Sequence, residues 1–104
     1  MRTRRKSNGE ALLKRALVII ERRWSCRILH ALLDGERSFS ELHVALETIT
    51  PRMLSRRLHE FEVGGIVAVR SERRPYHVFY RVKGSVKELR EMLAAIRKWG
   101  QKLR

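Results

Sequence analysis

The residues best suited to binding chemistry lie between Thr50 and Glu62. At 100° per residue, four polar side chains of this segment share one helical face: Arg52, Ser55, Arg56 and His59. The opposite face carries Leu54, Leu58 and Phe61, as expected for a helix packed on a core. An arginine fork can donate two hydrogen bonds to O6 and N7 of guanine, and serine can bond several base edges. This pattern predicts a helix that reads bases in the major groove of duplex DNA.

The ends of this segment also carry helix signals. Thr50 is a good N-cap, and Pro51 follows at the first helical position, where its missing N–H costs nothing. Gly64 and Gly65 mark the end of the helix. Thr50 belongs to the predicted DNA-contacting set, together with Arg57 beside the core edge, which suits phosphate. His59 suits either a phosphate contact or a solvent-facing position, and a purely solvated arginine face remains the alternative reading of the segment.

A basic hairpin follows the arginine-rich helix. β-Branched residues after Gly65 and the alternating run Tyr76–Val82 predict two strands, and Ser71–Pro75 between them is a turn. Three arginines lie around this turn: Arg70, Arg73 and Arg74. A basic tip beside a recognition helix suits an adjacent minor groove or its phosphates, whereas charge that keeps a strand edge from aggregating is the alternative.

The remaining elements are helices that position these two features. An apolar run from Ile28 stops at Gly35, and a second short helix spans Phe39–Leu46, capped by Ser38 or Ser40. Longer helices are predicted from Glu10 to Trp24 and from about Ser85 to Lys102. The expected fold is mainly α with a small β-hairpin: a winged helix-turn-helix with extra N- and C-terminal dimerisation helices.

The terminal helices carry apolar stripes that are wider than one buried face requires. Their outer faces are predicted to pair across a twofold axis in a homodimer. The predicted interface residues are Leu13, Leu17, Ile20, Leu89, Leu93, Ile96 and Trp99. Packing of both helices on the winged core of the same chain is the alternative.

Composition sets the class of partner. The 104 residues contain 24 Lys and Arg against 11 Asp and Glu, a formal net charge of +13, which attracts polyanions. The length suits a single domain over residues 10–104, preceded by a basic arm over residues 1–9 that is expected to be flexible. No apolar run is long enough for a membrane span and no signal peptide is visible, so we expect a cytoplasmic, nucleoid-associated protein with no membrane partner.

Catalytic and metal-binding patterns are not found in the sequence. There is no Ser/His/Asp or Cys/His arrangement, no phosphate-cradling glycine loop and no metal-ligand spacing, so we predict neither an enzyme nor a metal or cofactor site. The single cysteine, Cys26, lies one turn from Leu29 and Leu33 and is expected to be a small buried residue rather than a sensor thiol. No effector is indicated.

Several separated motifs together resemble the HxlR-type winged helix-turn-helix regulators. They occur in the family's order, between Leu13 and Gly100: Ile20–Ser25, Ile28–Gly35, Arg37–Leu42, Ile49–Leu58, Glu60–Glu62, Gly65–Val67, Tyr80–Val82 and Trp99–Gly100. The resemblance implies a dimeric bacterial or archaeal transcription regulator with MarR-like architecture.

Two departures from the family pattern stand out. The cysteine-proline pair that some members use to sense oxidants is replaced by Glu10-Ala11-Leu12, which argues against inherited redox sensing. The family's Ile-Gly-Gly-Lys-Trp is replaced by Ile20-Glu21-Arg22-Arg23-Trp24, which predicts that the first helix continues where glycines would break it.

Two functions from different classes fit these observations. The first is a homodimeric, sequence-specific regulator that binds double-stranded DNA at a pseudo-palindromic operator, with the recognition helix at about residues 50–62 and the wing at about 70–76. The second is a non-specific architectural DNA- or RNA-binding basic protein, which the charge fits equally well. The ratio of operator to random-DNA affinity separates them.

Overall fold

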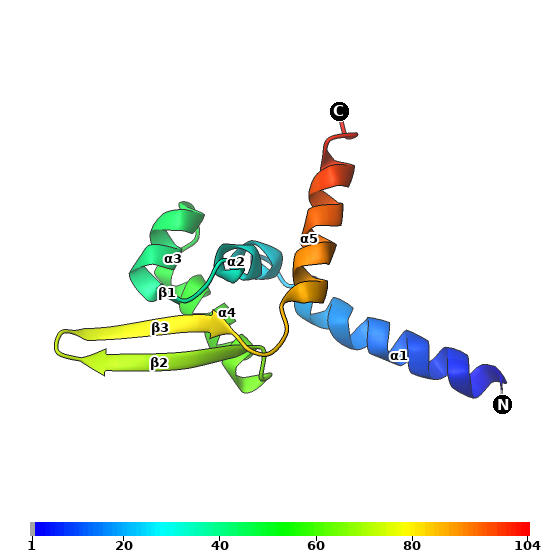
Figure 1. Ribbon diagram of the computed structural model, residues 1–104, viewed down its shortest axis with the longest axis horizontal. Helices are drawn as coiled ribbons and strands as arrows, with labels where there is room; N and C mark the ends of the chain where they lie inside the picture. The colour runs from blue at the N-terminus through cyan, green and yellow to red at the C-terminus, as the bar shows by residue number, and fades with distance from the viewer. Residues whose placement is uncertain (1) are drawn as a thin grey trace.

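The computed structural model describes residues 2–104, with side chains described from residue 8 onward. Five helices and a three-stranded antiparallel sheet are formed by these residues (Figure 1). The elements are α1 Arg2–Ile20, α2 Ser25–Leu32, β1 Arg37–Ser38, α3 Phe39–Leu46, α4 Pro51–Val63, β2 Val67–Arg73, β3 Tyr76–Val82 and α5 Lys87–Gly100. The predicted class, mainly α with a small β-sheet in a winged helix-turn-helix, is confirmed.

The hydrophobic core lies where α2, α3 and α4 pack against the sheet. Leu54, Leu58 and Phe61 are buried, as the periodicity of the arginine-rich helix predicted. The nine buried apolar residues all fall between positions 28 and 67: Ile28, Leu29, Leu32, Leu42, Ile49, Leu54, Leu58, Phe61 and Val67. The helix-turn-helix and the base of the wing therefore share one core.

Side-chain caps fix where α3 and α4 begin. Ser38 and Glu41 form a reciprocal capping box, in which Glu41 N donates to Ser38 Oγ (3.1 Å) and Ser38 N donates to Glu41 Oε1 (2.8 Å). Ser38, rather than Ser40, is therefore the cap of α3. Met53 N donates to Thr50 Oγ1 (3.1 Å) at the start of α4, so the predicted role of Thr50 as N-cap is confirmed.

The sheet contains one strand more than the sequence predicted. The short strand β1 pairs with β3 through Arg37↔Tyr80 and Ser38↔Phe79, which gives the order β1-β3-β2. Two residues are too few to produce a period, so this strand had no signal in the sequence. The hairpin strands also extend further than expected, since Arg73 pairs with Tyr76 and the turn shrinks to Arg74 and Pro75.

The first helix differs from its predicted bounds at both ends. It begins at Arg2 rather than Glu10, and it ends at Ile20 rather than continuing to Trp24. The side chains of residues 1–7 lie outside the described residues, and the flexibility of the basic arm over residues 1–9 stays a prediction.

The break after Ile20 corrects the expectation that the helix continues where the family has glycines. Trp24 adopts φ 77°, in the left-handed region, although it is not a glycine. One local and one tertiary hydrogen bond hold this turn: Ser25 N donates to Arg22 O (3.1 Å), and Arg57 Nε of α4 donates to Arg23 O (2.8 Å).

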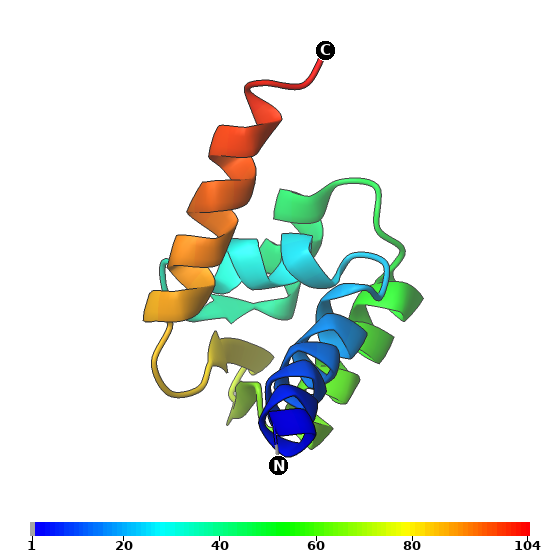
Figure 2. The ribbon, with the colours of Figure 1, turned by 90° about the vertical axis from the view of Figure 1, so that its right-hand side faces the viewer.

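The terminal helices project from the central body in different directions (Figures 1 and 2). None of the described residues of α1 or α5 is fully buried. Helix α5 is tied to the end of α2 by Arg90, whose Nη2 donates to Leu33 O (2.7 Å) and whose Nη1 lies 3.5 Å from Asp34 Oδ1.

Candidate nucleic-acid interface

The exposed face of α4 carries most of the predicted base-contacting residues. Arg52, Ser55, Arg56 and His59 are exposed, as predicted, on the side of α4 away from Leu54 and Leu58. None of the hydrogen bonds or ion pairs among the described residues involves Arg52 or Arg56. We call these four residues the groove face. Their side chains are available to a ligand.

Arg57 faces inward, in contrast to its neighbour Arg56. Its side chain is 13% exposed, its Nε donates to Arg23 O, and its Nη1 lies 2.9 Å from Glu60 Oε1. Arg22 joins the same carboxylate at 3.4 Å. The sequence placed Arg57 at a DNA phosphate, but the structure uses it to attach the α1–α2 turn to α4.

Arg70, at the middle of β2, is also held within the molecule. Its Nε and Nη2 reach the two carboxylate oxygens of Glu36 at 3.1 and 2.7 Å, and its Nη1 lies 2.6 Å from Glu72 Oε1. The guanidinium carbon also lies 4.4 Å from the ring centroid of Phe79, its partner on β3. The hydrogen bonds from Arg70 lower the pKa of Glu36. This cluster joins the wing to the loop before β1, and each of the three guanidinium nitrogens already has a carboxylate partner.

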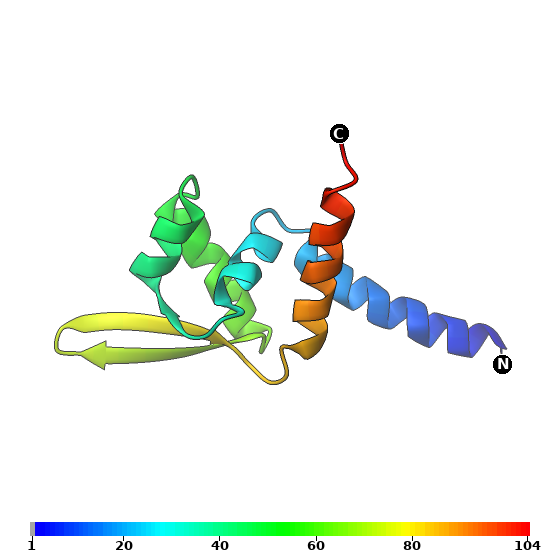
Figure 3. The same cartoon turned by 45° about the horizontal axis from the view of Figure 1, so that its top comes forward.

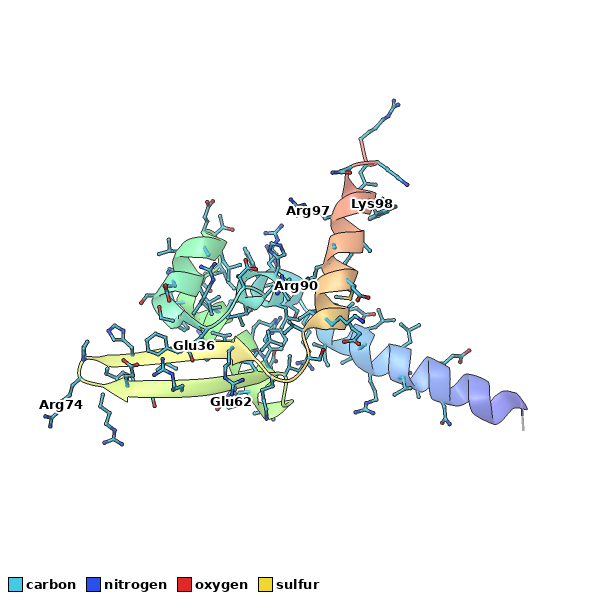
Figure 4. All side chains as sticks on the ribbon, viewed as in Figure 1. Glu36, Glu62, Arg74, Arg90, Arg97 and Lys98 are labelled. Carbon is cyan, nitrogen blue, oxygen red and sulfur yellow. The ribbon has the colours of Figure 1, made fainter. Side chains whose placement is uncertain are left out.

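The tip of the wing differs from its base. Arg73 and Arg74 are exposed, and neither takes part in an ion pair among the described residues. Figure 4 shows Arg74 at the far end of the hairpin, beyond the last pair of strand residues. Of the three predicted wing arginines, these two are the ones available to a phosphate.

The predicted dimer residues fall into two groups. Leu17, Ile20, Leu89 and Leu93 are half-buried, and Leu89 packs against the core of its own chain. Leu13, Ile96 and Trp99 are 60, 46 and 61% exposed. Intramolecular packing therefore accounts for part of each stripe, and the remainder faces solvent in the single chain.

Cys26 is half-buried rather than fully buried. Its Sγ lies 3.8 Å from Ile20 O, and burial raises the pKa of the thiol. It lines a groove of about 870 Å³ formed by α2, the end of α3 and α5, whose wall includes Leu93 and Ile96. A raised pKa reduces the thiolate fraction at neutral pH, which is the opposite of what a sensor thiol requires.

Several functional contacts had no signal in the sequence. Glu36 lies 34 positions from Arg70, and Arg90 lies 57 positions from Leu33, so only the folded chain brings each pair together.

Among the described residues, no group of three potential ligands is placed to hold a metal ion. No helix within the described part of the chain is long and apolar enough to cross a membrane.

The family model described as HxlR-like helix-turn-helix matches residues 19–104, which is most of the chain. The chain belongs to the HxlR-like helix-turn-helix family. The predicted resemblance is confirmed. The match includes every element that forms the core and the wing of this HxlR-like protein, and it begins just before the turn at Glu21.

Individual relatives of this HxlR-like protein agree with the family match. The HTH-type transcriptional regulator YvaP of Bacillus subtilis (strain 168) is 36% identical over 88 residues, covering 83% of this chain and 81% of the relative. A MarR-family structure from Enterococcus faecalis V583 matches with a TM-score of 0.76 at 30% identity, covering 89% and 86% of the two chains. The reduced form of the regulator YodB from Bacillus subtilis matches with a TM-score of 0.74 at 26% identity, covering 86% and 89%.

These relatives define the class of this HxlR-like protein. It is a transcription regulator with a helix-turn-helix DNA-binding fold, and the prediction that it is not an enzyme is confirmed by the class of its relatives. The MarR-like architecture expected from the sequence is confirmed as well.

Proposed function

We propose that this regulator acts as a homodimer on an inverted repeat in duplex DNA. The groove face of α4 enters the major groove, and the wing tip contacts the adjacent backbone or minor groove. The two recognition helices of the dimer then lie about one helical turn apart, roughly 34 Å. Half-sites at matching spacing follow from that separation.

The observation that carries the DNA-contacting part is the division among the arginines. Arg52 and Arg56 on α4, and Arg73 and Arg74 on the wing, are exposed, whereas Arg57 and Arg70 are held by partners within the chain. Free guanidinium groups are therefore present on both the helix and the hairpin that a winged helix presents to DNA. The net charge of +13 supports a polyanionic partner.

The dimer is supported by the exposed parts of the terminal helices. Leu13 on α1, and Ile96 and Trp99 on α5, leave large apolar surfaces in contact with water. Burial of apolar surface stabilises association by about 25 cal/mol per Å². A seam in which α5 meets α1 of a second copy removes these side chains from water, with Leu17, Ile20, Leu89 and Leu93 at its inner edge.

Selection from a random duplex pool, followed by binding to the selected and unselected DNA, tests the proposed function. We expect the selected sites to contain an inverted repeat and to bind at least about 10³-fold more tightly than random duplex. Two copies of the chain should bind each site. A ratio near one would instead support the non-specific architectural protein, which the charge also fits.

The wing has a separate readout. Replacing Arg73 and Arg74 together by alanine should reduce the slope of log K against log salt by up to about two, because each phosphate contact contributes about one counterion. Lys98→Ala near the end of α5 together with Lys102→Ala just after it removes the same charge and is the matched control. An unchanged slope in a folded Arg73/Arg74 variant would remove the wing tip from the backbone contacts.

A further inference from the structure

The turn between α1 and α2 lies near the loop between α3 and α4 (Figure 2). Residues from both segments line a small pocket. Its volume is about 300 Å³, and four residues line it: Arg23, Trp24, Arg27 and Thr48. The two arginines and the threonine carry hydrogen-bond donors, and no acidic residue is among the four. A pocket of this composition suits an anion with several acceptor oxygens.

The pocket lies beside α4 on the side away from the wing. The α1–α2 turn contacts α4 through Arg57 and Glu60, which bond Arg23 O and Arg22. At 100° per residue these two positions lie on one side of the groove face, and Glu62, which is close to Tyr80 of the hairpin, lies on the other. Figure 3 shows the same order, with the hairpin and the α1–α2 turn on opposite sides of α4.

The two arginines of the pocket are held in different ways. The guanidinium carbon of Arg27 lies 5.0 Å from the ring centroid of Trp24, so a cation–π contact limits where this charge can move. Arg23 is fixed through its backbone, since its carbonyl accepts from Arg57 Nε. Among the described residues, no acceptor is paired with the Arg23 side chain. One charge is therefore preoriented and the other is free to close on a ligand.

The backbone of the turn supports a binding role. Trp24 has φ 77°, a conformation that bulky residues rarely adopt, and such strain persists only where surrounding contacts hold it. Here the contacts are Ile28 N to Trp24 O (2.9 Å) and the bond from Arg57 to the preceding carbonyl. Strained residues concentrate at ligand-binding positions. The strain thus lies in the residue whose ring holds Arg27.

We propose that this pocket binds a phosphodiester group of the DNA duplex that receives α4 in its major groove. The inference rests on the proposed function. The major groove is bordered by one phosphate backbone on each side. The wing tip contacts the backbone on its side of the helix, and Arg23, Arg27 and Thr48 contact the backbone on the other. The groove face is thereby fixed between two backbone contacts, neither of which reads sequence.

The test uses the full chain and a random-sequence duplex of about 30 base pairs, because a backbone contact is present in every sequence. The variants are Arg23→Ala, Arg27→Ala and the double variant, with Lys98→Ala on α5 as the charge-matched control (Figure 4). Each single variant should reduce the slope of log K against log salt by about one, and the double variant by about two. The control should keep the parent slope.

The outcomes separate this proposal from the proposed function. A parent that binds no duplex DNA would overturn both. A parent that binds with a steep salt dependence, alongside a folded double variant of equal slope, would overturn the pocket alone. Where Arg27→Ala lowers the melting temperature by losing its contact with Trp24, Arg23→Ala decides the matter, since its side chain makes none of the described contacts.

A second measurement distinguishes a duplex phosphate from a free anion. Inorganic phosphate is titrated into the protein alone at constant ionic strength, while the NMR signal of the Trp24 indole is followed. We expect no saturable shift, because the duplex supplies its phosphate together with the contacts of α4 and the wing. A saturable shift that the double variant abolishes, with an unchanged DNA salt slope, would identify a free-anion site and overturn the proposal.

Discussion

The central winged helix-turn-helix and the two terminal helices differ in side-chain burial and in helix capping. All nine buried apolar residues lie in the central part, between Ile28 and Val67, and α3 and α4 there begin at side-chain caps. In contrast, α5 begins at Lys87 after Val86, which provides no side-chain cap, and neither terminal helix contains a fully buried residue among those described. The central part buries its apolar side chains within the chain. Helices α1 and α5 leave apolar side chains exposed, and we propose that a second copy covers them.

The largest expected effect tests the central core. Leu42 is fully buried at the centre of α3. Leu42→Ala should lower the free energy of unfolding by about 2–5 kcal/mol, because the smaller side chain leaves a cavity. Leu12→Ala on α1, where the side chain is 62% exposed, is the control and should stay within about 0.5 kcal/mol. Urea unfolding measures both. Equal losses at the two positions would show that α1 is as tightly packed as the core.

The second effect belongs to the terminal helices. Ile96→Glu puts a charge in the proposed seam. Burying this charge without a partner costs several kcal/mol, which we expect to prevent dimerisation. Analytical ultracentrifugation should therefore find a dimer for the parent and a monomer for the variant, with the helical circular dichroism of the core retained. Ala94→Glu, on the exposed opposite side of α5, makes the same charge change and should remain dimeric. A monomeric parent that binds its site as one copy would rule the dimer out.

Substitutions in the groove face should weaken DNA binding without changing the free energy of unfolding or the dimerisation of the protein. Replacing Arg52 or Arg56 by alanine should weaken binding to the selected site by about 1–3 kcal/mol and relax the preference at one base pair. Ser55 and His59 are expected to contribute less, and Lys98→Ala on α5, outside the groove face, serves as the control. Equal losses on selected and random DNA would assign both arginines to phosphate instead.

A smaller effect concerns the attachment of the wing to the core. Hydrogen bonds from Arg70 lower the pKa of Glu36 from its ordinary value of 4.5. Because the carboxylate is favoured in the folded state, its contribution is present above pH 4.5 and is lost as the pH falls through the lowered pKa. Glu36→Gln should therefore flatten the acid side of the stability profile while changing neutral stability little, since the pair is exposed. Glu10→Gln on α1 is the control. An unchanged acid limb would mean that the pair contributes nothing to stability.

The smallest effect is expected at the junction of the two regions. Cys26 is half-buried beside α5, and burial raises the pKa of its thiol, so little thiolate is present at neutral pH. DNA binding by the parent and by Cys26→Ser should respond equally little to peroxide. A peroxide-dependent loss of binding that the serine variant abolishes would make this cysteine a sensor.

Local signals accounted for most of the central region. Thr50 and Pro51 located the start of α4, Gly64 its end, and the alternation of Tyr76–Val82 located β3 residue by residue. Each of these signals acts within a few residues, through a cap, a fixed φ or a period of two. The strand β1 and the end of α1 were missed because they depend on partners distant in the sequence, namely β3 and Arg57.

The sequence by itself determined the class of this regulator through the order of its family motifs, and it determined the exposed face of α4 and the tip of the wing through short-range periodicity and turn residues. Only the tertiary structure decided which arginines remain available. Arg56 and Arg57 are neighbours of the same type, yet one faces solvent and the other bonds Arg23 and Glu60. The side chain of Arg70 is likewise occupied by its hydrogen bonds to Glu36, 34 positions away in the sequence. Charge is a property of the residue, but its freedom to bind a ligand depends on acceptors that folding brings within hydrogen-bond distance.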